Sequence, residues 1–520
     1  MRRLTLHQPE PLFDVHATRQ LEQAALITSP GQPLMARAGL AVAQLARAIA
    51  PHARCIWVAC GPGNNGGDGL IAATHLHRQT SARSGAPRVV ITHCGNPSQR
   101  PTAAAWALTQ AREAGVLFSD TMPPECDLVI DALLGIGRLR PPQGKMAEML
   151  QILQRTSTPV LCVDTPSGLD ANTGCHLLGP RSEAFTGTRQ TLSLLTLKPG
   201  LFTADGRDQA GTVWFDDLGV VQPAAAAPCA TLHATTPPDR FTDRSHAHHK
   251  GAGGDVLIIG GQGIVRDGTG MTGAAILAAR AALHAGAGRV YLSLLEEPAT
   301  RSVTGWDPVS PELMFRSTAA LRAGQWPPHA AVVCGCGGGH ALAPLLPEAL
   351  ARAQQLVLDA DALNLLAVDL VLEQVVRERS HAGRTTVLTP HPLEAARLLG
   401  CDTATVMNDR LQAARQLSER FGAICVLKGS GTVTCSASAT PLINASGNAL
   451  LATAGTGDVL AGMIGAALAA PGQGRSALLR VADAVWQHGW MADEWQRKKV
   501  LTGTTSTLTA DGLARRLSPT

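Results

Sequence analysis

Short, uniformly apolar segments alternate with amphipathic ones along most of this 520-residue chain, and this alternation limits its possible folds more than any other feature. Between residues 15 and 218 the apolar segments are CIWVAC (55–60), RVVITHC (88–94), DLVIDALLG (127–135) and PVLCVD (159–164). Runs without polar alternation are typical of strands buried on both faces, as in parallel sheets covered by helices. The segments between them have the pattern of helices. We therefore predict a doubly wound α/β domain.

The alternation restarts near residue 249, after a segment of different composition. Residues 219–248 are rich in Pro, Ala, Thr and His without a sustained period, which is typical of a linker. Further apolar segments at 254–261, 288–295, 330–335, 355–361, 384–390 and 423–429 predict a second, larger α/β domain. No repeat of 20–50 residues relates the halves. We expect an N-terminal domain at 1–218, a linker at 219–248 and a C-terminal domain at 249–520.

Composition argues against several classes of partner. The chain is 45% hydrophobic and has a formal net charge of +4 without a block of like charges, so nothing indicates nucleic acid or an anionic membrane as partner. No apolar run reaches the ~18 residues of a membrane span, and MRRLTLHQPEP lacks the apolar core of a signal peptide. The 12 cysteines form no CxxC pair, so we expect buried, reduced thiols and a cytoplasmic location.

A glycine-rich turn, GPGNNGGDG at residues 61–69, follows the apolar segment 55–60 and opens a helix. Such a turn at the carboxyl end of a strand directs free N–H groups and a helix N-terminus toward an anionic ligand. It does not match GxGxxG cleanly and lacks the lysine of a P-loop. Two alternatives therefore remain open: a site for a nucleotide-like ligand, or a tight turn in which Asp68 only caps the helix.

Three more polar residues follow predicted strands of the first domain. Asp131 and Asp164 each end an apolar segment, and Ser167 lies just beyond the second. The carboxyl ends of strands converge on one crevice in a doubly wound sheet. Asn65, Asp131 and Ser167 can therefore meet as oxygen ligands of a cation, and Asp164 can move a proton near a bound ligand. Taken singly, each aspartate is more often a cap or a turn residue.

NNGGDGL, DALLGIG and VDTPSGLDANTG, in this order and spacing, resemble the NAD(P)H-hydrate epimerase domain over residues 15–218. MARAG at 35–39 resembles a further segment of that family, with Arg37 where the family usually has Asn. The resemblance implies a Rossmann-like fold, epimerisation at C6 of the hydrated nicotinamide ring, catalysis by Asp164 and a K⁺ bound by Asn65, Asp131 and Ser167. It also implies hydrate contacts from Asn64, Asn65, Gly66, Gly67, Asp68, Gly135, Ile136, Gly137, Arg138, Leu139, Arg140, Pro141 and Asp164.

A second glycine turn, AGTGDVLAGMIGAAL at residues 454–468, precedes another apolar helix. The N–H groups of Gly455, Thr456 and Gly457 are placed to face a phosphate or a developing anion. A carboxylate at such a place, here Asp458, suits a base that takes a proton from a hydroxyl under attack. The alternative is that Asp458 is a helix-start residue favoured by the dipole alone.

This second turn resembles that of the ribokinase-like superfamily. Seven blocks in order resemble the ADP/ATP-dependent NAD(P)H-hydrate dehydratases across 249–515: HKGAGGDVLIIGG, GMTGAAILAARAAL, GAGRVYL, SPELM, VLDADALN, LTPHPLEAARLLG and VLKGSGTV. The resemblance implies Asp458 as the base, with the hydrate touching Asp458, Ala274, Gly337 and His391. It implies a nucleotide site made by Lys428, Gly429, Ser430, Gly431, Thr432 and Gly457, with Mg²⁺ bridging the phosphates.

Two departures from that family and one alternative bear on the second site. QGIVRDGT at 262–269 is an insertion before the GMTGA helix, and Cys336 replaces the proline of the family's GPGLG-like turn. Cysteine removes the fixed φ that proline would impose. For His391, the TPHP segment also allows a purely structural turn.

The two resemblances together imply a bifunctional NAD(P)H-hydrate repair enzyme, both isomerase and lyase. One domain would interconvert the R and S hydrates, NADHX and NADPHX. The other would dehydrate the S epimer at the expense of ADP, giving AMP and phosphate, or of ATP. Two alternatives stay open: a small-molecule alcohol kinase with a binding-only N-terminal domain, and a non-enzymatic module like those of RNA-processing scaffolds. We further expect a homo-oligomer.

Overall fold

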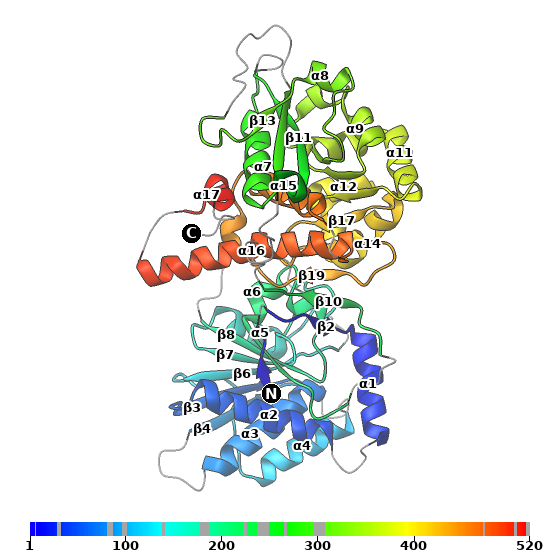
Figure 1. The fold of residues 1–520 in the computed structure, drawn as a ribbon. Helices are drawn as coiled ribbons and strands as arrows, with labels where there is room; N and C mark the ends of the chain where they lie inside the picture. The colour runs from blue at the N-terminus through cyan, green and yellow to red at the C-terminus, as the bar shows by residue number, and fades with distance from the viewer. Residues whose placement is uncertain are drawn as a thin grey trace. The chain divides into compact units, whose positions relative to one another are not determined.

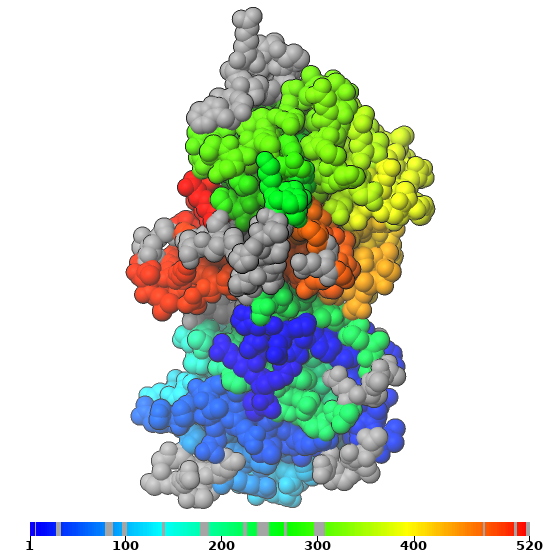
Figure 2. Space-filling view, viewed as in Figure 1, coloured from blue at the N-terminus to red at the C-terminus, as the bar shows by residue number. Residues whose placement is uncertain are grey.

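The computed structural model describes residues 1–5, 7–28, 33–80, 87–95, 101–137, 141–176, 187–221, 226–236, 249–264, 268–295, 307–471, 474–503 and 507–515. The chain divides into two compact units (Figures 1 and 2). One comprises Met1–Thr5 and Glu10–Thr231, and the other Leu6–Pro9 and Leu232–Thr520. The segment expected to be a linker contains a strand, β10 (Ala230–His233). The predicted domain limits themselves stay a prediction.

The first unit is built on an eight-stranded sheet in the order β1-β9-β8-β7-β6-β3-β4-β5. Its strands are β1 (Arg2–Arg3), β3 (Cys55–Cys60), β4 (Arg88–His93), β5 (Leu117–Phe118), β6 (Leu128–Ala132), β7 (Val160–Val163), β8 (Arg189–Leu194) and β9 (Thr212–Asp216). All pair in parallel except β1, which is antiparallel to β9. Counted from β3, the parallel strands follow the doubly wound order of dinucleotide-binding folds. The predicted Rossmann-like fold is confirmed.

Helices cover both faces of this sheet. They are α1 (Val15–Thr28), α2 (Leu34–Ile49), α3 (Asn64–Thr80), α4 (Thr102–Glu113), α5 (Lys145–Arg155) and α6 (Gly206–Ala210), with the short helix η2 (Pro199–Leu201) and strand β2 (Glu10–Leu12). Ile56 and Val58 pack with α2, α3 and α4, whereas Trp57 and Ala59 pack with α5 on the opposite face (Figure 1). Because each face is buried, β3 carries no polar alternation.

The second unit has a larger sheet in the order β13-β12-β11-β14-β15-β16-β17-β18-β19-β10. Its further strands are β11 (Asp255–Gln262), β12 (Arg289–Leu295), β13 (Met314–Phe315), β14 (Ala331–Cys334), β15 (Gln355–Leu358), β16 (Thr385–Leu388), β17 (Ile424–Leu427), β18 (Val433–Cys435) and β19 (Leu442–Asn444). The strands from β13 to β17 are parallel, and β18 and β19 continue antiparallel. The second α/β domain predicted from the sequence is therefore confirmed.

The helices of the second unit lie between these strands in the chain or, from η5 onward, after the last of them. They are α7 (Thr272–His284), α8 (Thr318–Arg322), α9 (Leu346–Arg352), α10 (Asp361–Leu366), α11 (Leu370–His381), α12 (Pro392–Leu399), α13 (Thr403–Asn408), α14 (Arg410–Phe421), α15 (Thr456–Ala469), α16 (Ala477–Thr502) and α17 (Ala510–Arg515), with η3 (Lys250–Gly253), η4 (Gly339–Leu342) and η5 (Ala449–Leu451). Helix α15 packs against α7 and α16, which places its N-terminus near the ends of β14 and β15. No helix among the described residues is long and apolar enough to cross a membrane.

Candidate active sites

The glycine turn of the first unit meets the loop that follows β6. Helix α3 begins at Asn64, so Asp68 is its fifth residue and the alternative of a simple helix cap is wrong. A Cβ on Gly135 would lie 3.0 Å from Cγ of Asn65, which brings the two predicted substrate loops together. A cavity of about 310 Å³ borders the second loop at Gly135, Ile136 and Gly137. Residues 138–140, also predicted to bind the hydrate, lie outside the described residues.

Asp131 and Ser167 form one buried network beside this turn. The Ser167 hydroxyl donates to Oδ1 of Asp131 at 2.5 Å, and the Ser167 N–H donates to Oδ2 at 2.9 Å. Burial raises the pKa of Asp131, and the hydrogen bonds from Ser167 oppose that shift. Nδ2 of Asn65 is buried and has no hydrogen-bond partner within the described part of the chain. The three predicted cation ligands thus lie in the first turn of α3 (Asn65), in β6 (Asp131) and in the loop after β7 (Ser167).

Asp164 is paired with a lysine that sequence reasoning missed. Lys198 is fully buried, and its ammonium donates to Oδ1 of Asp164 and to the carbonyls of Leu194 and Thr196, the last two at 2.7 and 2.9 Å. Asp164 has a left-handed backbone, with φ of 64°, and also accepts from the N–H of Leu194 at 3.0 Å. The available signal was a lysine inside the apolar segment LSLLTLKPGLF, in a chain with six lysines.

Two further carboxyl groups face this ion pair. Burial, followed by the charges of Asp164 and Glu22, holds the pKa of Asp68 well above its usual range. Burial and the charge of Asp164 also raise the pKa of Glu22, although Lys198 and Arg19 oppose this. The first unit thus combines an aspartate that is ion-paired with carboxyl groups biased toward the protonated form, which is a pattern of acid–base sites. Sequence reasoning also missed Glu22.

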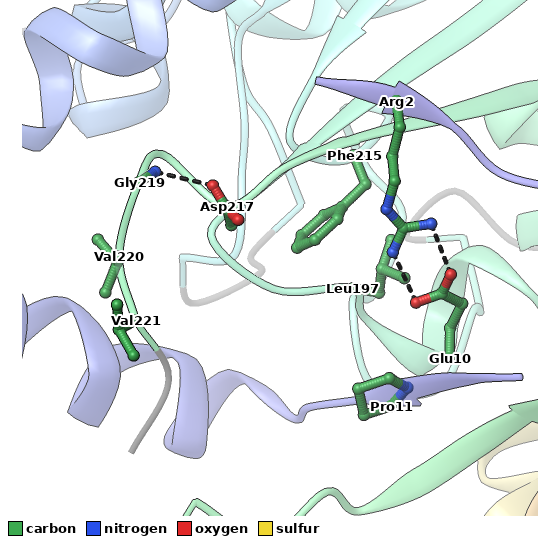
Figure 3. A pocket seen from close by; sticks show the side chains of 9 residues that line it. All are labelled: Arg2, Glu10, Pro11, Leu197, Phe215, Asp217, Gly219, Val220 and Val221. Carbon is green, nitrogen blue, oxygen red and sulfur yellow. Dashed lines mark hydrogen bonds and ion pairs between the residues drawn. The ribbon is translucent and has the colours of Figure 1, made fainter. Parts of the chain in front are cut away.

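A second pocket of the first unit, of about 430 Å³, contains none of the predicted site residues. Figure 3 shows the Arg2 guanidinium facing both carboxylate oxygens of Glu10, at 2.5 and 2.7 Å, beside the ring of Phe215. Because Arg2 is already paired, it is poorly placed to receive an anionic ligand.

In the second unit, the N-terminus of α15 carries Asp458 into a polar cluster. Gly455, with φ of 89°, is the N-cap, and no side chain caps the helix. The carboxylates of Asp458 and Asp359 and the sulfur of Cys336 lie within 4.8 Å of one another. Burial, then the charge of Asp359, raises the pKa of Asp458 to about 6, while Cys336 and Lys428 oppose the shift. A carboxyl group with this pKa can exchange protons near neutral pH.

The predicted nucleotide turn faces the same cluster. Nζ of Lys428 donates to Oδ1 of Asp359 at 2.7 Å, and a Cβ on Gly457 would lie 3.5 Å from that nitrogen. The buried Arg410 donates to the carbonyls of Lys428 and Leu427 at 3.3 and 3.2 Å and so holds the backbone where the turn begins. Burial disfavours the charge of Lys428, but Asp359 and Glu394 outweigh it and raise its pKa. The roles of Asp359 and Arg410 were not predicted.

The turn from 429 to 432 presents its backbone at the surface side of this cluster. Gly429 and Ser430 are exposed, and Gly429 and Gly431 have positive φ angles of 134° and 61°. The Thr432 hydroxyl donates to the carbonyl of Gly429 at 3.1 Å, which closes the turn. These residues directly follow Lys428 in the chain, and their backbone N–H groups suit a phosphate-binding turn.

His391 has a clear structural role at the start of α12. Its Nδ1 accepts from the N–H of Glu394 at 3.2 Å, and Glu394 accepts from the N–H of His391 at 2.9 Å, which forms a capping box. Burial, then the charge of Lys428, lowers the pKa of His391. Its side chain nevertheless remains 46% exposed, and the preceding Pro390 accepts from the N–H of Lys428 at 2.9 Å. His391 thus has a structural role beside the cluster, and its contact with the hydrate stays a prediction.

The remaining predicted hydrate residues adjoin each other. A Cβ on Gly337 would lie 2.9 Å from Cβ of Ala274. The N–H of Gln262, at the start of the insertion, donates to the carbonyl of Gly337 at 2.7 Å. Residues 265–267 of the insertion lie outside the described residues. The second site therefore runs from Ala274 and Gly337 through Asp458 to Lys428.

Comparisons with known proteins assign the family. A model of the YjeF-related protein N-terminus matches residues 31–200, and one of NAD(P)H-hydrate dehydratase matches 256–515. A bifunctional NAD(P)H-hydrate repair enzyme of Escherichia coli (strain K12) is 33% identical, over 94% of this chain and 89% of its own. The chain belongs to the bifunctional NAD(P)H-hydrate repair enzymes. A repair enzyme of Leishmania braziliensis is 34% identical, over 88% of this chain and 84% of its own.

Other relatives of this repair enzyme match its second unit. An ADP-dependent (S)-NAD(P)H-hydrate dehydratase of Neisseria meningitidis is 39% identical, over 49% of this chain and 82% of its own. A solved ADP/ATP-dependent NAD(P)H-hydrate dehydratase of Bacillus subtilis, co-crystallised with ATP and Mg²⁺, is 26% identical with a TM-score of 0.43, covering 53% of this chain and 91% of its own. Membership of the repair-enzyme family favours the expected function over the alcohol-kinase and binding-module alternatives.

Proposed function

We propose that this chain restores hydrated NADH and NADPH through two activities on one polypeptide. The first unit interconverts the R and S hydrates, and the second dehydrates the S epimer while converting ADP to AMP and phosphate. The observation that carries the proposal is the meeting of Asp458, Asp359 and Lys428 at the N-terminus of α15, in a chain of the repair-enzyme family. The related dehydratase named as ADP-dependent supports ADP as the nucleotide.

In the second unit, Asp458 takes the proton of the C6 hydroxyl. The hydroxyl oxygen bonds to the terminal phosphorus of ADP, and the bond from that phosphorus to AMP breaks. The N–H groups from Gly455 to Gly457 and the ammonium of Lys428 stabilise charge on the transferring phosphoryl group. Mg²⁺ bound with the nucleotide would supply positive charge at its phosphates. Phosphate then leaves C6 with the bonding electrons, and loss of a proton from C5 re-forms the ring double bond.

In the first unit, Asp164 acts at the hemiaminal carbon. Its pairing with Lys198 keeps the side chain fixed, so its carboxylate can stabilise an iminium-like ring while the hydroxyl leaves and returns. Burial and the charge of Asp164 raise the pKa of Asp68 and so favour its protonated form, which can give a proton to the departing hydroxyl. Water returning to either face of the ring gives either epimer.

The residues of the first unit fit a bound K⁺. Asp131 and Ser167 supply oxygen atoms, and the unpartnered amide end of Asn65 is buried beside them. Because amide nitrogen and oxygen are assigned from hydrogen bonding, the opposite assignment would present an oxygen, and oxygen ligands suit hard cations. The ion would supply positive charge beneath the substrate loops. Exchange of K⁺ for Li⁺ should lower the unfolding temperature of the first unit, and Asp131→Asn should remove that difference.

The proposed function is tested with a mixture of R and S NADH hydrates, ADP and the full chain, following the near-UV absorbance of regenerated NADH. Rapid recovery of the whole mixture is the expected result. Recovery of only the S fraction would contradict the epimerase, and no recovery with ADP or ATP would contradict the dehydratase. Formation of a stable phosphate ester would instead support the alcohol kinase. The homo-oligomeric state and the cytoplasmic location remain predictions.

A further inference from the structure

Cys336 has a side-chain position that its two glycine neighbours determine. Gly335 has φ of 121°, and a Cβ there would lie 1.9 Å from the carbonyl oxygen of Asp359. Gly337 has φ of 58°, and a Cβ there would lie 2.5 Å from the carbonyl oxygen of Met271. The turn is thus held on both sides by backbone, and Cys336 between them is fully buried.

The thiol of Cys336 lies at the two carboxylates of the second site. Its sulfur is within 4.8 Å of the carboxylate oxygens of both Asp458 and Asp359. The two aspartates are held differently. Asp359 accepts from the Lys428 ammonium at 2.7 Å and from the Thr389 hydroxyl at 2.8 Å, whereas the Cys336 thiol is the neighbour that most favours the ionised form of Asp458.

Cys336, Asp359 and Asp458 are close enough together to bind a metal ion, but their chemistry favours proton exchange instead. The Lys428 ammonium already neutralises Asp359, so a cation bound there would face its charge. Burial, followed by the charges of Asp458 and Asp359, holds the pKa of the Cys336 thiol well above its usual range. The thiol therefore stays protonated near neutral pH and remains a hydrogen-bond donor rather than a thiolate ligand.

We propose that Cys336 is a positioning residue for proton transfer at Asp458: its S–H group donates to the carboxylate, stabilises the ionised form and restricts the orientation of the side chain. This inference rests on the proposed role of Asp458 as the base. Proline, which the resembling family carries in this turn, offers no donor, so the contact is a feature of this chain rather than of the turn.

The electrostatic surroundings of Asp458 agree with this role. Burial and the charges of Asp359 and Asp361 favour the protonated carboxyl group, and only Cys336 and Lys428 among its described neighbours with a resolved influence favour the carboxylate. Removal of the thiol would leave Lys428 to do this alone, and Lys428 is itself paired with Asp359. The pKa of Asp458, about 6, should therefore rise when the thiol is removed.

The test compares the pH dependence of kcat/KM for dehydration of the pure S hydrate with ADP, using the full chain. The acid limb is the fall of kcat/KM at low pH. In Cys336→Ala and Cys336→Pro this fall should occur at a pH about 0.5–1 unit higher, because a weak donor to a charged group is lost. Cys336→Ser keeps a donor and should leave the limb in place or lower it. The matched control is Cys334→Ala, since Cys334 is equally buried but its pKa, raised to about 12, reflects burial alone.

Each outcome bears on the proposal separately from the proposed function. An acid limb unchanged in Cys336→Ala, or moved equally by Cys334→Ala, would overturn the inference while leaving the base intact. Retained dehydration in Asp458→Asn would overturn both the base and this inference. The melting transition that ADP shifts reports whether the second unit of each variant has folded. Should Cys336→Ala fail to fold, an acid limb moved upward in Cys336→Ser would overturn the proposal by itself.

Discussion

Replacement of Lys198 tests how much the buried ion pair between Lys198 and Asp164 contributes to stability. Lys198→Met keeps the apolar stem but removes an ammonium that is fully buried and bonded to Asp164 and two carbonyls. Removal of one partner of a buried ion pair leaves the other charge uncompensated and costs about 3–5 kcal/mol. For a unit of this size, each kcal/mol lowers the melting temperature by about 2–4 °C, so a fall of roughly 6–20 °C is expected. Epimerisation should also be lost.

The assay is scanning calorimetry of the full chain with and without ADP, because the transition that ADP shifts belongs to the second unit. The double variant Asp164→Asn with Lys198→Met removes both charges and should regain most of the stability but none of the epimerase activity. Lys145→Met, which removes a lysine from an exposed pair with Asp120, is the control and should change little. Equal melting temperatures for Lys198→Met and the wild type, or no recovery in the double variant, would refute the reasoning.

Three further predictions concern the two aspartates. Asp458→Asn should reduce dehydration by a factor of at least ~10² and leave epimerisation unchanged, and loss of both activities would contradict two separate sites. The same variant should be more stable than the wild type at pH 7, by up to about 3 kcal/mol and with a higher unfolding temperature, since the folded chain raises the pKa of Asp458 to about 6 and the ionised carboxylate is therefore destabilising. This gain should vanish below about pH 4, where the carboxyl group is protonated in both states, and a gain that persists there in calorimetry would count against the assignment. Asp164→Ala should consume only the S hydrate, and conversion of the R hydrate faster than its unaided epimerisation would argue against that role.

Strands buried on both faces were predictable because uninterrupted runs of apolar residues make up most of each one. Strands β3, β4, β6 and β7 coincide with predicted segments for this reason. Strand β8 was missed because Thr191 and Ser193 interrupt its apolar pattern. Both are fully buried, and their hydroxyls donate to the carbonyls of Ala210 and Thr196 at 2.8 Å. Because these carbonyl acceptors are brought to the hydroxyls by the fold, the sequence of β8 alone has the polar pattern of an exposed segment.

The sequence by itself determined the two α/β domains, the two glycine turns and the aspartates at their ends, because these depend on local patterns of apolar and small residues. Only the tertiary structure decided how the buried charges are compensated. Lys198 lies 34 residues from Asp164, and Lys428 lies 69 residues from Asp359. A buried charge is stable only beside its partner, and the pairing depends on which strand ends the fold brings together. The same holds for the thiol of Cys336, which reaches Asp458 only because β14 ends beside the N-terminus of α15.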